Sequence, residues 1–140
     1  MIRKISTGKR PLKGPDYALL EQKLCGGPDG IPLDKTDLEV LRNSGTAFCW
    51  ESPLAISVEE AADMAEQAAA DMAPEAGRLI TASILYIVIN QENDLTPVEQ
   101  ISGLIQPTLP EAALWVCGVG VCGSPKGIRF LLATAEGEAQ

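Results

Sequence analysis

A run of mostly apolar residues from Leu79 to Ile89 constrains the fold more than any other feature of the sequence. Its length and its content of isoleucine, leucine and valine predict a strand at the centre of a sheet, buried on both faces. A transmembrane helix needs about 20 apolar residues, so this run is too short to span a bilayer. No secretory signal is visible near the N-terminus, and we therefore expect a cytoplasmic protein. With 140 residues, the chain is most simply one domain built around this strand.

Shorter patterns before and after this run predict the other elements. Ser57 to Glu60 form a capping box that starts a helix with alanines on its buried side, and Thr96 to Glu99 form a second box before another helix. The glycine-rich segment 123–127 joins the last two strands, which we expect to pair as an antiparallel hairpin. From residue 46 the predicted order is strand, helix, strand, helix, strand, strand. The strands are at 46–50, 79–89, 112–121 and 128–134; the first helix is at 58–72, and the second starts at Pro97 and is closed by Pro107 or Pro110.

This order predicts an α/β (α+β) fold, a two-layer sandwich in which a four-stranded mixed sheet carries two main helices on one face. One or two short helices precede it. Asp16 to Leu24 fits one of them, and Asp34 can cap a second from Lys35 to about Asn43. The other face of the sheet must then be covered by these helices or by a partner. We expect residues 15–140 to form this single domain.

Charge is distributed unevenly along the chain. The net charge of −8 argues against general nucleic-acid binding, because phosphate contacts need a basic face. Residues 1–14 are different, since they hold five of the eleven basic residues and no acid precedes Asp16. We predict a flexible basic arm there; the alternative is a tail that docks on an acidic partner. The basic residues of this arm are Arg3, Lys4, Lys9, Arg10 and Lys13.

The residue types present limit the chemistry. The sequence has no histidine, which removes the commonest general base and the usual nitrogen ligand of zinc. Its four cysteines follow no zinc spacing, and we expect them to be buried, unreactive thiols. A glycine-rich phosphate-binding motif is also absent. We therefore predict neither a metal nor a cofactor.

Five side chains are candidates for a functional site. Asp34 and Asp37 lie three positions apart, on one side of a predicted helix start. They are either an exposed carboxylate pair that can orient water or residues that cap the helix and favour its dipole. Trp50, Trp115 and Arg129 are candidate binding residues, because tryptophans often anchor an interface and all three could line a crevice between subunits.

The order of the elements resembles the C-terminal domain of the FtsZ/tubulin family, the filament-forming cell-division GTPases. The resemblance runs from about Gly30 to Glu136. In that family a loop of the form Asn-x-Asp-Phe-Ala-Asp-Val precedes a helix and then Gly-x-Ala. Asp34 and Asp37 stand at the two aspartate positions of this loop, and Gly45 and Ala47 follow at the expected places. The segments 85–89, 94–101, 113–118 and 128–134 resemble later strands and helices of the same domain.

The resemblance has clear departures. The GTP-binding half of the family would precede residue 16 and is missing, so we expect no binding of GTP in the family's manner by this chain alone. Pro32 replaces the asparagine of the loop, and Ala135 replaces the glycine that usually ends the last strand. In FtsZ-like proteins the loop aspartates reach the nucleotide of the next subunit and help to orient water. The resemblance therefore implies that Asp34 and Asp37 act, if at all, on a partner's nucleotide.

Two main hypotheses for function follow. The first is a non-catalytic assembly or protein-interaction module, which forms homo-oligomers and contacts an FtsZ-type protein. The alternative is a small-ligand-binding or catalytic α/β domain with its site at a subunit interface. A metal or redox role would depend on the four cysteines alone.

Overall fold

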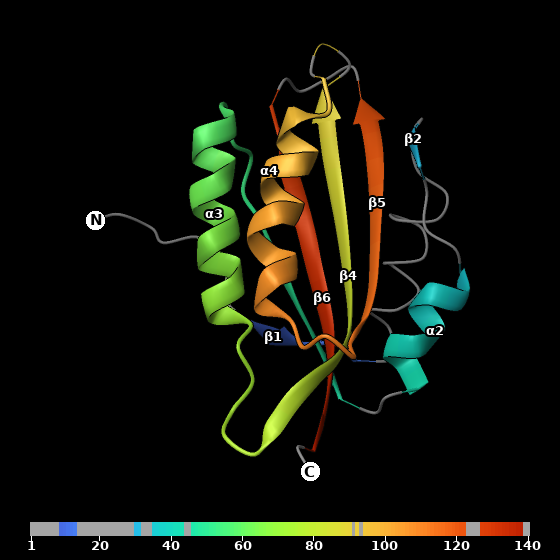
Figure 1. Cartoon of the computed structure of the whole chain (residues 1–140). Helices are drawn as coiled ribbons and strands as arrows, with labels where there is room; N and C mark the ends of the chain where they lie inside the picture. The colour runs from blue at the N-terminus through green and yellow to red at the C-terminus, as the bar shows by residue number, and fades with distance from the viewer. Residues whose placement is uncertain are drawn as a thin grey trace.

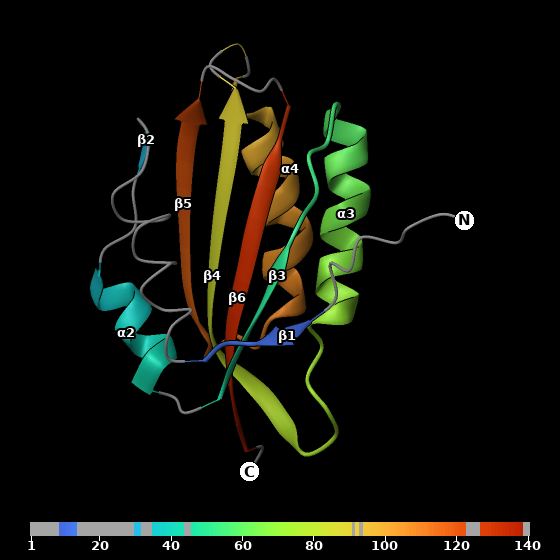
Figure 2. The ribbon, with the colours of Figure 1, turned by 180° about the vertical axis from the view of Figure 1, so that it is seen from behind.

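The computed structural model describes residues 9–13, 30–31, 35–43, 46–90, 92, 94–122 and 127–138. They form a mixed sheet with two helices on one face and one helix on the other (Figures 1 and 2). In chain order the elements are β1 (Arg10–Pro11), β2 (Gly30–Ile31), α2 (Lys35–Asn43), β3 (Ala47–Glu51), α3 (Val58–Asp71), β4 (Arg78–Asn90), α4 (Thr96–Ile105), the 3-10 helix η1 (Gln106–Thr108), β5 (Leu114–Cys122) and β6 (Arg129–Glu138).

β4 lies at the centre of the sheet, as its apolar sequence predicts. The strand order is β1-β3-β6-β4-β5-β2. β4 pairs in parallel with β5 on one side and antiparallel with β6 on the other. β3 pairs antiparallel with β6, and the two-residue strands β1 and β2 extend the sheet at its edges. The four long strands are thus the predicted mixed sheet, with two short strands added.

The predicted hairpin between β5 and β6 is wrong. The two strands lie on opposite sides of β4 and do not pair with each other. The reason is that β6 uses both of its edges in this position, one against β4 and one against β3. Pairing beside β5 would place this largely buried strand at an edge, with backbone groups left to find other partners.

The layer of α3 and α4 covers the main hydrophobic core. α3 starts as predicted, because the Ser57 hydroxyl accepts a hydrogen bond from the Glu60 backbone N–H at 3.1 Å. Its inner side consists of fully buried alanines, which let the helix lie close to the sheet. The predicted cap of α4 is corrected: Leu95, not Thr96, is the N-cap residue, and it makes no side-chain cap. Here the Asp94 carboxylate accepts the Thr96 backbone N–H at 2.9 Å.

The opposite face of the sheet carries a second cluster, beneath α2. This helix spans Lys35–Asn43, as predicted, and buries Leu38 and Leu41 against strands of the sheet. We expected N-terminal helices or a partner to cover this face, and α2 supplies part of the cover (Figure 2). The predicted helix from Asp16 to Leu24 lies outside the described residues.

Five residues of the predicted basic arm, 9–13, lie against the sheet. Arg10 and Pro11 pair with Cys49 and Phe48, and the Leu12 N–H donates to the Ala47 carbonyl oxygen at 2.9 Å. In the part of the chain that is described, no helix is both long enough and apolar enough to cross a bilayer.

Candidate functional site

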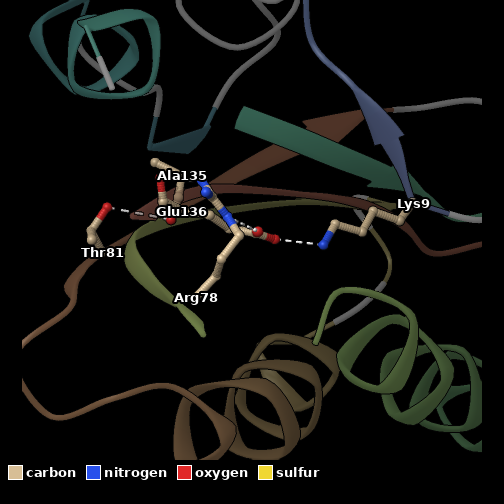
Figure 3. A network of polar contacts seen from close by, with 5 residues as sticks. All are labelled: Lys9, Arg78, Thr81, Ala135 and Glu136. Atoms are coloured by element: carbon tan, nitrogen blue, oxygen red, sulfur yellow. Dashed lines mark hydrogen bonds and ion pairs between the residues drawn. The ribbon is translucent and has the colours of Figure 1, made fainter. Parts of the chain in front are cut away.

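Glu136 is the one buried charged residue among those the structure describes. Its side chain is 2% exposed and lies between two cations (Figure 3). The Lys9 ammonium approaches one carboxylate oxygen at 2.5 Å, and Arg78 Nε approaches the other at 3.3 Å. Arg78 also donates to the Glu136 carbonyl oxygen at 3.3 Å. Burial of a carboxylate is strongly unfavourable unless it is paired, and these two cations supply the pairing.

The geometry around Glu136 suits a structural role better than a catalytic one. The Lys9 ammonium also lies 4.2 Å from the centre of the Phe48 ring, a cation–π contact. On the neighbouring strand the Thr81 hydroxyl donates to the Ala135 carbonyl oxygen at 3.3 Å (Figure 3). Both carboxylate oxygens are therefore engaged, and the cluster joins residues before β1 to the last strand. A carboxylate held in this way is not poised to take a proton from a substrate.

Two buried hydroxyl residues lie between two aromatic residues in a row that crosses the sheet next to this cluster, on the face beneath α3 and α4. Phe48, Thr134, Ser83 and Trp115 lie opposite one another in register on β3, β6, β4 and β5. The hydroxyls of Ser83 and Thr134 are buried, and neither has a hydrogen-bond partner among the described residues. Such groups are rare in protein interiors because each loses its hydration without compensation.

Trp115 borders a hollow of about 270 Å³ between the end of α4 and the start of β5. This volume is at the lower limit of small-molecule pockets, which hold roughly 300–1,000 Å³. The hollow has a carboxylate and an amide but no cation in its lining, so it does not suit an anionic ligand. The lining residues are Gln106, Leu109, Pro110, Glu111, Ala113 and Trp115.

The structure does not bring the three predicted binding residues together. Trp50 is only 1% exposed and stacks on Phe130, with ring centres 5.5 Å apart. Its indole N–H donates to Asp71 at 2.8 Å, so Trp50 lies under α3 and not on an uncovered face. Trp115 is opposite Ser83 and Arg129 is opposite Val88. These two positions on β4 are five residues apart, or roughly 17 Å at about 3.3 Å per residue, and Arg129 lies on the α2 face.

The described part of the chain includes only one of the two predicted aspartates. Asp34 is outside the described residues, and Asp37 is the third residue of the helix. A role for them in trans therefore stays a prediction.

Cys49 and Cys117 are poor candidates for chemistry. Cys49 is fully buried, and burial raises the pKa of the half-buried Cys117 thiol above its ordinary value. A thiol with a raised pKa is mostly protonated at neutral pH and is a weak nucleophile. Within the described ranges, no three side chains of the metal-binding types come together.

The sequence analysis did not predict the ion pairs of Glu136 or the buried hydroxyls of Ser83 and Thr134. Lys9 and Glu136 are 127 positions apart, and no local pattern links them. No alternation along β6 marks Glu136 either, because residues 130–136 are all buried and the next residue on the same face, Glu138, is exposed.

Comparison with solved structures shows what this arrangement of elements is similar to. An empty FtsZ dimer from M. jannaschii matches over 76% of this chain, with a TM-score of 0.55 and 19% sequence identity. A tryptophan-to-tyrosine mutant of FtsZ from the same organism matches over 86%, also at 0.55, with 16% identity. The chain has the fold of part of FtsZ.

This result confirms the resemblance to the C-terminal domain of FtsZ that the sequence predicts. The matched region is 32% and 36% of the two FtsZ chains, so this chain spans about a third of their length. A third structure, AaThiL complexed with AMPPCP and TMP, reaches a TM-score of only 0.44, which is too low to support an argument. No protein-family model and no curated protein matches the sequence. At these identities the likeness to FtsZ concerns the fold alone.

Proposed function

We propose that this chain is a non-catalytic assembly or protein-interaction module, which associates with its own copies and with FtsZ-type filaments. The observation that carries the proposal is the shared fold: a central β4, flanked by β5 and β6, with α2 on one face and α3 and α4 on the other. A chain that reproduces about a third of FtsZ offers surfaces that another FtsZ-like molecule can accept.

The sharper form of the proposal assigns the contact to the start of α2. Asp34 directly precedes this helix and Asp37 belongs to its first turn. In the FtsZ-like arrangement the equivalent loop meets the nucleotide of the next subunit. We propose that the two carboxylates accept hydrogen bonds from water beside a partner's nucleotide, as carboxylates do in phosphoryl transfer.

The non-catalytic part of the proposal draws support from the described side chains. The Glu136 carboxylate is occupied by Lys9 and Arg78, and the pKa of Cys117 is raised by burial. Neither group is a prepared base or nucleophile. The alternative, a ligand site between subunits, has only the hollow beside Trp115 in its favour, since Trp50 is buried and Arg129 lies on the other face.

The test mixes the protein with FtsZ and GTP and follows polymerisation by light scattering and hydrolysis by phosphate release. We expect both to change at stoichiometric protein. The double variant Asp34→Asn/Asp37→Asn should lose the effect on hydrolysis, whereas Glu39→Gln, an exposed acid on the same helix, should keep it. Unchanged polymerisation and hydrolysis with the wild-type protein would contradict the contact with FtsZ.

A further inference from the structure

Three large apolar side chains are exposed at the end of the sheet where α3 and α4 begin. Ile56 is 81% exposed and directly precedes the N-cap of α3, and Leu54 in the same loop is 38% exposed. Leu95, the N-cap residue of α4, is 59% exposed. The two helices pack side by side and start at the same end of the molecule (Figure 1). We call Leu54, Ile56 and Leu95 the apolar end patch.

The loop that carries Leu54 and Ile56 is held rigidly. Between them, Ala55 exchanges two backbone hydrogen bonds of 2.8 Å with Ile128. Gly127 lies directly beneath the loop at φ +130°, and a Cβ there would come within 2.6 Å of the Ala55 carbonyl oxygen. The backbone of this loop is therefore ordered before any partner binds, and binding would not have to order it.

The turn before α4 is held in a similar way. The Asp94 carboxylate accepts the Thr96 N–H, and the Glu99 N–H donates to the Leu95 carbonyl oxygen at 3.1 Å. Single exposed apolar residues are common on protein surfaces, but here three occur on two fixed turns at neighbouring helix starts. Exposed apolar side chains that gather at one end of a molecule, rimmed by polar residues, mark a candidate interaction surface.

Charge around the patch identifies the type of partner. Five acids stand in or beside the two turns, and the sequence has no basic residue in 43–77 or 79–125; the acids are Glu59, Glu60, Glu92, Asp94 and Glu99. Glu59 and Glu60 lie in the first turn of α3, and their two full charges outweigh the partial positive charge of about one half at the helix start. Glu99 does the same in α4. Arg129 begins β6 at this end but lies on the α2 face, and Lys126 is outside the described residues.

We propose that the apolar end patch binds a basic segment of another protein, which carries aliphatic side chains together with lysine or arginine. The aliphatic groups would cover Ile56 and Leu95, and the cations would face Glu59, Glu60 and Glu99. A surface of this charge repels nucleic acids and anionic membranes, which leaves a cationic polypeptide as the complementary ligand. The site goes beyond the proposed function, because it lies away from α2 and needs no FtsZ.

The experiment uses a fluorescent peptide of lysine and leucine, with leucines at helical i, i+3, i+4 and i+7 spacing. A second peptide keeps the charge but has serine in place of leucine. Anisotropy titrations with the full chain should show binding of the leucine peptide. The variant Ile56→Ser/Leu95→Ser should weaken it about tenfold or more. Leu114→Ser is the matched control, because Leu114 is 46% exposed at the opposite end of the sheet.

Charge variants test the second half of the proposal. Glu59→Gln/Glu99→Gln should weaken binding several-fold and reduce its dependence on salt, whereas Glu75→Gln/Glu111→Gln, exposed at the other end, should not. Far-UV circular dichroism confirms that each variant is folded. Equal binding of the two peptides, or equal affinity of the wild type and the Ile56→Ser/Leu95→Ser variant, would overturn the proposal. Binding that appears only after residues 1–8 are removed would assign the patch to the chain's own arm and also overturn it.

Discussion

Lys9 and Glu136 are 127 positions apart in the sequence and form an ion pair of 2.5 Å in the folded protein. Through this contact the residues before β1 are attached to the last strand of the sheet. Arg78, at the start of β4, completes the cluster from the other side. Three segments that are distant in the chain thus meet at one buried carboxylate.

Removal of the two cations should destabilise the protein more than removal of the carboxylate. Glu136→Gln removes the anion, but Lys9 and Arg78 are already partly exposed and can be hydrated. We therefore expect a loss of about 1–3 kcal/mol in the free energy of unfolding. Lys9→Ala/Arg78→Ala leaves a buried charge without a partner, which typically costs about 3–5 kcal/mol. Urea denaturation at neutral pH measures both.

Two further variants make this comparison decisive. Adding Glu136→Gln to the Lys9→Ala/Arg78→Ala variant should restore part of the lost stability, because the unpaired charge is removed. Arg10→Ala breaks the exposed pair with Glu51 and should change stability by less than about 1 kcal/mol. If the Glu136→Gln variant is the least stable of the set, the cluster does not work as described.

The hydroxyl of Thr134 should be replaceable by a methyl group. It is buried without a hydrogen-bond partner in the described part of the chain, so Thr134→Val removes an uncompensated polar group at nearly constant volume. We expect stability to be unchanged or to rise by about 1 kcal/mol.

Ser52→Ala is the control with the opposite expected outcome, because the Ser52 hydroxyl accepts the Phe130 backbone N–H at 2.8 Å. This substitution should lower stability by about 1 kcal/mol. Thermal unfolding distinguishes the two; a clear loss with Thr134→Val would mean that its hydroxyl is satisfied in solution.

Trp50 should contribute through both its ring and its N–H. Trp50→Phe keeps an aromatic ring against Phe130 but loses the hydrogen bond to Asp71, and we expect a loss of about 1–3 kcal/mol. Asp71→Asn keeps an acceptor oxygen and should cost less. Urea unfolding of both variants checks this order, which would be reversed if the carboxylate charge mattered more than the hydrogen bond.

Local patterns in the sequence predicted most of the fold. The apolar run around Leu85 identified the central strand, and the capping residue Ser57 located the start of α3, because both signals lie in neighbouring residues. Strand pairing is different. The segment at 123–127 suggested a hairpin, but β6 pairs with β3 and β4 instead. Backbone hydrogen bonds along both edges of β6 outweigh the preference for a short connection to β5.

The candidate site was less predictable, because it depends on contacts between distant segments. Trp50 was a candidate ligand platform, and only the packing of α3 and Phe130 around it shows that it belongs to the core. To predict the ion pairs of Glu136, one must know the register of β6 and the position of β1 beside β3. Exposure of Ile56 and Leu95 likewise follows from two turns, whose backbone hydrogen bonds no sequence pattern specified.

Asp94 should make the stability of the protein depend on pH. Its carboxylate accepts the backbone N–H of Thr96 and interacts with the Thr96 hydroxyl, and these contacts hold its pKa below the ordinary value of 3.8. A carboxylate whose pKa is lower in the folded state stabilises that state above the ordinary pKa, and this contribution is lost as the pH falls through the lowered value. Asp94→Ala should therefore be less stable than the wild type at pH 7, and the difference should shrink as the pH falls below about 4. Asp94→Asn can still accept the Thr96 N–H but carries no charge. Its loss of stability at pH 7 should therefore be smaller than that of Asp94→Ala and should come mainly from the missing charge. Urea unfolding of the three proteins at pH 7, 5 and 3 provides the measurement, and a difference between Asp94→Ala and wild type that stays constant over this range would show that the charge of Asp94 does not contribute.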